Sequence, residues 1–251
     1  MPIPSEKLQK ILANKGLGSR RELETWISAG RVSVNGKISK LGDRALPTDK
    51  IRVDGRLIKT SKNAAKTKVL MYHKPEGVIC TRSDPEGRRT IFDRLPPIKN
   101  GRWINIGRLD INTTGLLLFT NNGELANKLT HPSSEVEREY AIRVKGAVTD
   151  EMATNLTEGV SLEDGQARFE HFMSAGAAEG VNQWYYGVVV EGRNRVVRRL
   201  IESQGLTVSR LMRVRYGPIT MPKWLKVGRW DELNEKQVKQ IEDFLAGDDD
   251  Q

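Results

Sequence analysis

The sequence predicts an α+β protein with a small N-terminal domain and a larger domain built on a mixed, largely antiparallel sheet flanked by helices. Short helical and alternating stretches are mixed along the chain, without regular βαβ alternation. At 251 residues, the chain exceeds the usual size of one domain. The lysine-rich stretch SKNAAKTK has no periodicity and reads as a linker. We therefore expect domains at 1–62 and 69–245, a linker at 63–68 and an acidic tail at 246–251.

The N-terminal domain begins with two predicted helices. SEKLQKILANKG places apolar residues at helical spacing, with Ser5 as the expected N-cap. SRRELETWISAGR starts a second helix at Ser19, and Glu22 three residues later completes a capping box. Two hairpins follow, because the alternating stretches RVSVNGKIS and DKIRVDGRLIK surround the turn pairs Asn-Gly and Asp-Gly.

The larger domain alternates short apolar strands with helices. Strands are expected in VLMYHKPEG, GRLDINTTGLLLFT, REYAIRVKG and WYYGVVVEG, and a helix in NRVVRRLIESQG. No apolar run approaches the ~20 residues that a membrane span needs. Cys80 is the single cysteine, so an internal disulfide and a cysteine metal cluster are excluded. We expect a cytoplasmic protein without a membrane association.

The charge of the chain is gathered into two blocks. The net formal charge is +9. Residues 1–60 hold 13 Lys and Arg against 6 Asp and Glu, and residues 187–229 hold 10 against 2. The rest of the chain is therefore net acidic. A clustered positive charge favours a polyanion-binding surface over general solubility.

The first basic block surrounds the two predicted helices. An ordinary solvated helical face would intersperse acids with bases, whereas bases dominate here. The stretch EKLQKILANKGLGSRRELETWISAGRVSVNGKI resembles the S4 RNA-binding domain. That resemblance implies contacts with the backbone of structured RNA. The candidate RNA-binding residues in this block are Lys7, Lys10, Lys15, Arg20, Arg21 and Arg31.

Asp110 precedes an apolar strand in the stretch GRLDINTTGLLLFT. One interpretation is a turn-forming or capping aspartate, since Asp commonly bonds nearby backbone N–H groups. The other is a nucleophile or base held at the end of a strand. Ordinary glycoside hydrolysis needs two acids at a set separation, and the neighbouring sequence offers no convincing second acid.

Four stretches resemble, in order, the motifs of the pseudouridine synthases, in the branch that includes the small-subunit enzyme RsuA. They are HKPEGVICT from His73, GRLDINTTGLLLFTNNGELANKLTHP from Gly107, EREYAIRV from Glu137 and EGRNRVVRRLIESQG from Glu191. The S4-like domain in front also matches this branch. Together the resemblance covers residues 5 to about 230.

The resemblance implies that Asp110 is the catalytic aspartate of an RNA pseudouridine synthase. The uracil would detach, rotate and rejoin through carbon 5, without a metal, cofactor or activated water. The implied substrate is a uridine in ribosomal RNA, above all the 23S rRNA of the large subunit, and the implied state is a monomer. The alternatives are another rRNA site, a non-catalytic ribosome-assembly protein and an RNA glycosylase.

The resemblance also assigns supporting roles, each with a structural alternative. Tyr140 would pack on the everted uracil, or it is a core residue of its strand. Arg198 would keep the carboxylate of Asp110 ionised, or it belongs to a solvated or phosphate-binding face. Arg108 would enter the gap left by the base or contact its phosphate, or it forms a surface ion pair.

Further residues complete the predicted site. Lys74 is expected to shape the pocket wall rather than to form a Schiff base, and Val197 belongs to the apolar stripe of its helix beside the pocket. Arg193, Arg195 and Arg199 are expected to face RNA. His73, His131 and His171 are scattered without metal-ligand spacing, so we expect no metal site.

Overall fold

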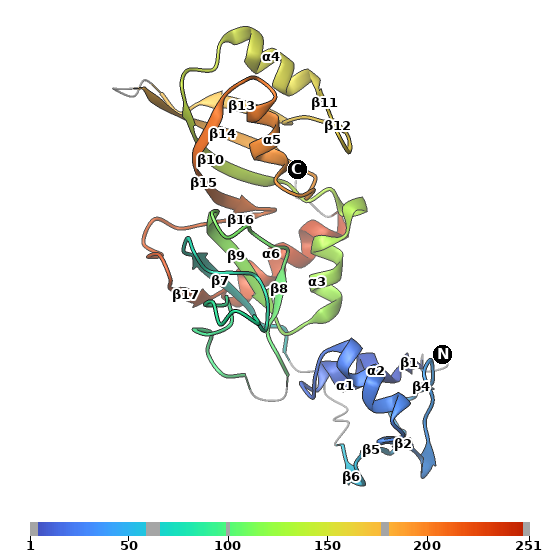
Figure 1. Cartoon of the computed structure of the whole chain (residues 1–251). Helices are drawn as coiled ribbons and strands as arrows, with labels where there is room; N and C mark the ends of the chain where they lie inside the picture. The colour runs from blue at the N-terminus through green and yellow to red at the C-terminus, as the bar shows by residue number, and fades with distance from the viewer. Residues whose placement is uncertain (1–4, 59–65, 99–100, 177–180, 248–251) are drawn as a thin grey trace. The chain divides into compact units, whose positions relative to one another are not determined.

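The computed structural model describes residues 5–58, 66–98, 101–176 and 181–247, and the chain divides into two compact units (Figure 1). Unit 1 comprises Met1–Thr67 and Pro97–Trp103, and unit 2 comprises Lys68–Pro96 and Ile104–Gln251. Residues 63–65 of the predicted linker and 248–251 of the predicted acidic tail lie outside the described residues.

Unit 1 packs two helices against small sheets. Its elements are β1 (Glu6–Lys7), α1 (Leu8–Asn14), α2 (Arg20–Ser28), β2 (Val32–Val34), β3 (Lys37–Ile38), β4 (Arg44–Ala45), β5 (Ile51–Val53) and β6 (Arg56–Leu57). The strands pair as β3–β2–β5–β6 and as β1–β4. Both helices bury apolar side chains in one core, which includes Leu8, Leu12, Leu23 and Ile27.

Most local predictions for unit 1 are confirmed. Ser19 accepts a hydrogen bond from the Glu22 backbone N–H, and the Glu22 side chain accepts one from Ser19, which completes the predicted capping box. Both hairpin turns form, and the left-handed φ of Asn35 (50°) and Asp54 (48°) suits turns of this type. The predicted N-cap Ser5 is wrong: residues 6–7 form β1, and α1 begins at Leu8.

Pro97–Trp103 clusters with unit 1, although it lies far along the chain from the N-terminal residues. The close approach occurs at two glycines. A Cβ on Gly16 would lie 2.5 Å from the carbonyl oxygen of Gly101, and φ of Gly16 is +80°. Only glycine fits there without a shift of the backbone.

Unit 2 contains the large sheet. Its strands are β7 (Val69–Lys74), β8 (Ile104–Ile106), β9 (Thr114–Thr120), β10 (Arg138–Lys145), β11 (Val160–Leu162), β12 (Gly165–Ala167), β13 (His171–Ser174), β14 (Asn182–Val189), β15 (Thr207–Tyr216), β16 (Ile219–Thr220) and β17 (Trp230–Glu232). Its helices are α3 (Gly123–Thr130), the 3₁₀ turn η1 (Pro132–Ser134), α4 (Asp150–Glu158), α5 (Val196–Glu202) and α6 (Glu235–Ala246).

The nine-stranded sheet runs β13–β14–β10–β15–β9–β7–β17, with β16 on β15 and β8 on β9. Among the described strand pairs of this sheet, β15 and β9 pair in parallel and the others are antiparallel. The prediction of an α+β fold with a mixed, largely antiparallel sheet is therefore confirmed. The parallel pair joins the two halves of the sheet.

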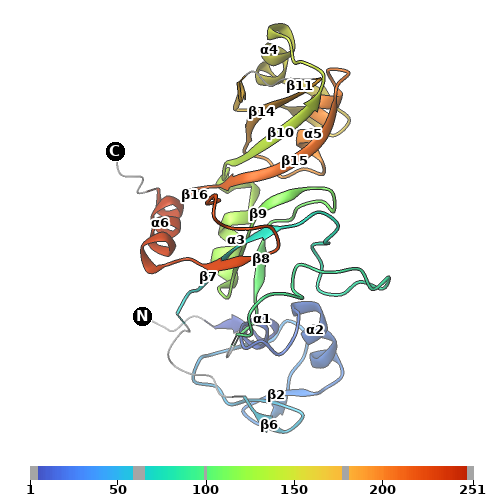
Figure 2. The same ribbon diagram turned by 90° about the vertical axis from the view of Figure 1, so that its left-hand side faces the viewer.

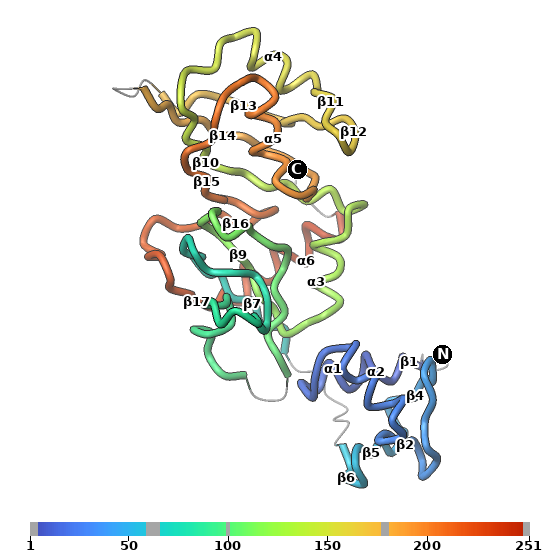
Figure 3. The backbone as a smooth tube through the Cα atoms, in the orientation of Figure 1, coloured from blue at the N-terminus to red at the C-terminus, as the bar shows by residue number. Residues whose placement is uncertain are grey.

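Helices accompany both halves of this sheet. Figures 1 and 2 show α3 and α6 beside the half that holds β7, β8 and β9, and α4 and α5 beside the half that holds β10, β14 and β15. In the tube of Figure 3, β14 leads through a short turn into α5, which returns to β15. No described helix combines the length and apolar character that crossing a membrane requires.

Candidate active site

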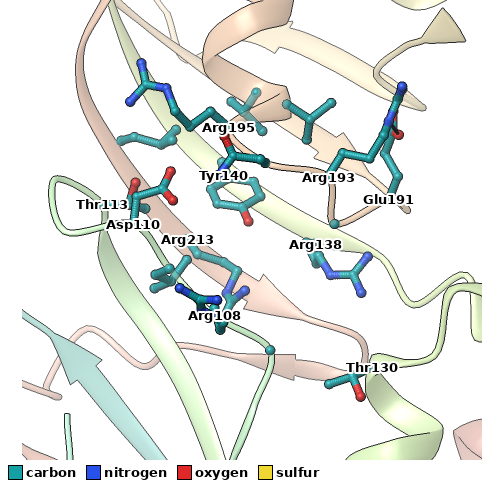
Figure 4. Close-up of a pocket in the computed structure, with 17 residues that line it drawn as sticks. Arg108, Asp110, Thr113, Thr130, Arg138, Tyr140, Glu191, Arg193, Arg195 and Arg213 are labelled. Atoms are coloured by element: carbon teal, nitrogen blue, oxygen red, sulfur yellow. Dashed lines mark hydrogen bonds and ion pairs between the residues drawn. The ribbon is translucent and has the colours of Figure 1, made fainter. Parts of the chain in front are cut away.

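A pocket of about 410 Å³ opens where the two halves of the unit 2 sheet meet. The loop between β8 and β9, strands β10 and β15, and the turn that leads into α5 all contribute to it (Figure 4). Its polar and charged lining comprises Arg108, Asp110, Thr113, Thr130, Arg138, Tyr140, Glu191, Arg193, Asn194, Arg195 and Arg213. The predicted residues Arg108, Asp110, Tyr140, Val197, Arg193 and Arg195 thus come together in one pocket.

Asp110 lies in the tight turn that leads into β9. Its carbonyl accepts a hydrogen bond from the Thr113 backbone N–H at 3.0 Å, and the next carbonyl, of Ile111, accepts one from Gly77 at 2.9 Å. The residue is half-buried, and Figure 4 shows its carboxylate facing the ring of Tyr140. The turn-forming and the functional interpretation of Asp110 are compatible here, because the backbone makes the turn and the side chain enters the pocket.

Lys74 lies beneath that turn and not among the pocket-lining residues. It is fully buried, and its Nζ donates to the carbonyls of Thr113 (2.9 Å), Asp110 (3.0 Å) and Pro75 (3.1 Å). Burial lowers the pKa of Lys74, and the charges of Cys80 and Asp110 partly offset this. Lys74 therefore holds the backbone of the turn, and its part in shaping the pocket stays a prediction.

Arg198 reaches the Asp110 turn through backbone carbonyl groups. It is buried in α5, where its two Nη atoms donate to the carbonyls of Asn112 and Val208, both at 3.0 Å. Among the described residues, no ion pair joins Arg198 to Asp110, and Arg198 does not line the pocket. Burial lowers its pKa, while the charge of Asp110 raises it. Arg198 thus contacts the backbone of the Asp110 turn. It acts on the Asp110 carboxylate only through the electric field of its guanidinium group.

Tyr140 is both a pocket residue and a nearly buried strand residue, with 9% of its surface exposed. It lies on β10, directly opposite Arg213 of β15. Figure 4 shows its ring in the centre of the pocket. Val197 of α5, which is 3% exposed, supplies apolar lining beside it. The ring and this methyl surface offer a flat apolar platform for a planar ligand.

The predicted site did not include six of the charged or polar lining residues: Thr113, Thr130, Arg138, Glu191, Asn194 and Arg213. The two arginines are buried, with 8% of Arg138 and 1% of Arg213 exposed. Both guanidinium carbons lie near the ring centroid of Tyr216, at 5.3 Å and 4.8 Å. A signal existed: arginines interrupt the apolar alternation of two strands, REYAIRV and LMRVRYG, at positions where a strand would bury its side chains.

The arginines of the turn and of α5 are engaged within the protein. Arg193 contacts Glu191 and donates to Asp164 at 3.0 Å, and Arg199 makes a bidentate pair with the same Asp164 at 2.8 and 2.9 Å. These contacts tie α5 to the turn between β11 and β12. Arg195 has a longer contact, 3.5 Å from Glu202, and lines the pocket. An RNA-facing role for the three arginines stays a prediction.

The six basic residues predicted for the first block all belong to unit 1. Lys7, Arg20 and Arg21 are exposed. Lys10 pairs with Glu6 at 2.7 Å, and Arg31 pairs with Asp54 at 2.6 Å while its guanidinium lies 4.4 Å from the Trp26 ring. Lys15 is half-buried in the C-cap of α1.

The Pro97–Trp103 segment adds Arg102 to the cations of unit 1, a residue outside the first basic block. Burial and the neighbouring charge of Arg20 lower the pKa of Arg102. Arg102 thus lies near Arg20, although its segment is far along the chain from α1 and α2. Within the described residues, no group of three or more His, Cys, Asp or Glu is arranged to hold a metal ion.

Comparison with known proteins defines the class of this protein. The family model described as RNA pseudouridylate synthase matches residues 68–203, and the S4 domain model matches residues 6–51. The chain belongs to the RNA pseudouridylate synthase family and carries an N-terminal S4 domain.

Three similar relatives share one name, "Ribosomal large subunit pseudouridine synthase B". The protein of Pseudomonas aeruginosa is 59% identical over 93% of this chain and 61% of its own length. That of Vibrio cholerae is 59% identical over 96% of this chain and 75% of its own length, and that of Escherichia coli K12 is 58% identical over 96% and 84%. A solved structure, "Crystal structure of pseudouridylate synthase", shares the fold with a TM-score of 0.64 at 24% identity, covering 94% of this chain and 99% of its own.

Proposed function

We propose that the protein isomerises a uridine of large-subunit (23S) ribosomal RNA to pseudouridine, with Asp110 as the catalytic carboxylate. The observation that carries this proposal is Asp110, the one lining acid without an ion pair among the described residues, whose carboxylate faces the ring of Tyr140. The other lining acid, Glu191, is bound to Arg193. The names of the similar relatives supply the substrate class. We further propose that the protein works in the cytoplasm and as a monomer.

The chemistry conserves atoms and electrons. The bond between N1 of the uracil and C1′ of the ribose breaks, and a bond between C5 and C1′ forms. The hydrogen on C5 leaves as a proton, and N1 ends with one. Asp110 either adds to the ribose or assists elimination, and both routes use a single carboxylate. No activated water takes part, in contrast to a glycosidase, which needs a second acid for that purpose.

The other residues position the reacting groups. The target uridine leaves its stack to reach the pocket, and Tyr140 with Val197 replaces the lost stacking contact. Arg108, which is exposed at the mouth, is placed to contact the RNA where the base has left. Lys74 and Arg198 keep the Asp110 turn in one conformation through its carbonyl groups.

The test combines mapping with one substitution. Carbodiimide-based pseudouridine mapping of rRNA from cells that lack this gene should show a single missing modification, in the 23S rRNA. Purified protein should restore it, and Asp110→Asn should abolish the isomerisation while RNA affinity stays within about threefold, because only the charge is lost. Asp150→Asn, at the exposed start of α4, is the matched control and should keep full activity.

Three results separate the alternatives. Turnover by Asp110→Asn would refute the assignment of the carboxylate. Restoration of ribosome assembly by that variant, without any missing modification, would favour a non-catalytic RNA-binding role. Release of free uracil would identify a glycosylase.

A further inference from the structure

Two buried arginines line the pocket, and no acid among the described residues forms an ion pair with either of them. Arg138 of β10 lies directly opposite Tyr216 of β15, and Arg213 of β15 lies opposite Tyr140 of β10. A register shift between Glu139 and Tyr140 brings Arg213 and Tyr216, three residues apart, to the same face of the sheet. The side chains of both arginines, which line the pocket, therefore converge on the buried ring of Tyr216.

Neither guanidinium has an ionic partner among the described residues. Arg138 donates to the carbonyl of Val190, and Arg213 donates through Nε to the carbonyl of Leu116 at 2.8 Å. Nη2 of Arg213 is buried without a hydrogen-bond partner. A buried cation is costly unless it is paired with an anion. Each of these arginines has only a backbone carbonyl and the Tyr216 ring beside it, and these neutral groups offset only part of the cost of burying the charge.

The acids of the pocket do not supply the missing charge. Glu191 forms an ion pair with Arg193. Asp110 makes no ion pair with either buried arginine, and Figure 4 shows the ring of Tyr140 between Asp110 and Arg138. The carboxylate of Asp110 is therefore separate from Arg138 and Arg213, whose positive charge has no anionic partner among the described residues.

We propose that Arg138 and Arg213 form a subsite for one phosphodiester group of the RNA, the phosphate that flanks the everted uridine. This inference rests on the proposed function. Uracil and ribose are neutral, so the backbone phosphate is the anion that an everted nucleotide brings into the pocket. Guanidinium groups suit phosphate because they offer several donors in a planar fork. The subsite holds the nucleotide by its backbone, while Tyr140 receives the base.

The proposed subsite also explains why the guanidinium groups of Arg138 and Arg213 lie near the ring of Tyr216. That ring is 1% exposed, and its hydroxyl donates to the carbonyl of Leu129 at 2.7 Å, which anchors it in the core. Two guanidinium groups near one anchored ring lose little side-chain freedom when a ligand binds. Preorganised groups spend less binding energy on ordering.

The experiment is a double-mutant cycle between a neutralised phosphate and each arginine. Crosslinking of the protein to rRNA selects a stem–loop that it binds. Single methylphosphonates, which remove one phosphate charge, are then placed at successive positions of the loop. Dissociation constants are measured by fluorescence anisotropy for Asp110→Asn and for the same chain with Arg138→Gln or Arg213→Gln added. Arg168→Gln, whose residue pairs with Glu170 outside the pocket, is the matched control.

One methylphosphonate, next to the isomerised uridine, should weaken binding about tenfold or more in the Asp110→Asn chain and in the Arg168→Gln control. The same change should cost less than about threefold once Arg138 or Arg213 is replaced. Equal losses in all chains would overturn the subsite. If a Gln variant does not fold, the Asp110→Asn chain still provides a test. The proposed subsite is overturned if no single methylphosphonate in the loop weakens binding to that chain.

This outcome is separable from that of the proposed function. Isomerisation of the unmodified stem–loop by the wild-type chain tests the reaction. Isomerisation without coupling would refute only the phosphate subsite, and coupling without isomerisation would refute only the proposed activity.

Discussion

At the scale of single residues, the site is held through its backbone. Lys74 and Arg198 approach the Asp110 turn from two sides, and their donors reach the carbonyls of residues 110, 112 and 113. The carboxylate of Asp110 has no ion pair among the described residues, so under the proposed function it is available to the substrate. Preorganisation of this kind fixes the geometry of a reacting group without neutralising it.

Replacing Lys74 tests this arrangement. Lys74→Met should lower the free energy of unfolding by about 2–4 kcal/mol, because several buried carbonyls lose their donor. The control Lys68→Met removes a surface lysine that pairs with Glu232 at 2.8 Å, and it should cost at most about 1 kcal/mol. Urea denaturation measures both. A Lys74→Met chain with wild-type stability would contradict the role of the lysine.

Arg198 makes a different prediction, because its two bonds reach the turn and the start of β15. Arg198→Ala should lower turnover on the order of 10²-fold by displacing the turn, with a smaller effect on the affinity for RNA. Arg210→Ala, at an exposed position of β15, is the control. Single-turnover rates and dissociation constants are the measurements. If Arg198→Ala does not fold, the arginine is structural and its assigned role is wrong.

At the scale of elements, the parallel pair β9–β15 decides where the pocket forms. Arg213 of β15 pairs with Gly115 of β9, whose φ is +103°. A Cβ on Gly115 would lie 2.2 Å from the carbonyl oxygen of Arg213, too close for any side chain. The glycine therefore lets the two halves of the sheet join directly below the Asp110 turn.

Gly115→Ala should accordingly destabilise unit 2 by several kcal/mol, on the order of 3 or more, since backbone must move. Gly205→Ala is the matched control: its φ of +73° is also left-handed, but no atom lies within 4 Å of the added methyl. It should cost about 1–2 kcal/mol. Urea denaturation measures the loss of unfolding free energy in both variants. Equal losses would show that backbone strain, and not the close approach to Arg213, explains the need for glycine at position 115.

The link between α5 and the β11–β12 turn is pH-dependent. The hydrogen bonds of Arg199 lower the pKa of Asp164 below its usual value, and the charges of Arg193 and Arg199 act in the same direction. A lowered carboxylate pKa stabilises the fold above the unfolded pKa, about 3.9, and that stabilisation is lost as the pH falls.

Asp164→Asn should therefore be less stable than the wild type at pH 7, and the difference should shrink as the pH falls through the range in which Asp164 becomes protonated. Urea denaturation at a series of pH values measures it. Asp231→Asn, for which no ion pair is seen among the described residues, is the control and should show a smaller difference at pH 7. A gap between wild type and Asp164→Asn that widens toward low pH would contradict the ion-pair account.

At the scale of the whole molecule, the positive charge lies in two blocks with different surroundings. The block in residues 1–60 lies in unit 1, where Lys7, Arg20 and Arg21 are exposed. The block in residues 187–229 is partly buried, and several of its arginines, among them Arg198, Arg199 and Arg213, bond to carbonyls or acids within unit 2. The first block is thus suited to general backbone contacts, and the second to the pocket and its frame.

Neutralising the exposed residues should change the salt dependence of binding. With Lys7, Arg20 and Arg21 replaced by Gln, the slope of log affinity against log salt should fall by about 2–3, because each phosphate contact contributes about 0.7–0.9. Turnover of bound RNA should be retained. An unchanged slope would show that these side chains do not contact phosphate.

Local sequence signals were sufficient wherever neighbours in the chain decide the structure. The capping box at Ser19 and the two hairpin turns formed as predicted, because each depends on residues within a few positions. Ser5 failed as a cap, since residues 6–7 pair with β4, about 38 positions away. The backbone contact of Arg198 was not visible in the sequence for a related reason: α5 and the turn at Asn112 meet only in the folded structure.

What the sequence by itself determined is the class of fold, the two-part organisation and the motifs that carry Asp110, Tyr140 and Arg198, since residue type and short spacing encode these. Only the tertiary structure decided which side chains share the pocket. Arg138 and Arg213 come together because β10 and β15 are neighbours, and the strand pairing that makes them so is absent from any local pattern. Contacts between distant segments depend on how the strands are ordered, which no single stretch of sequence specifies.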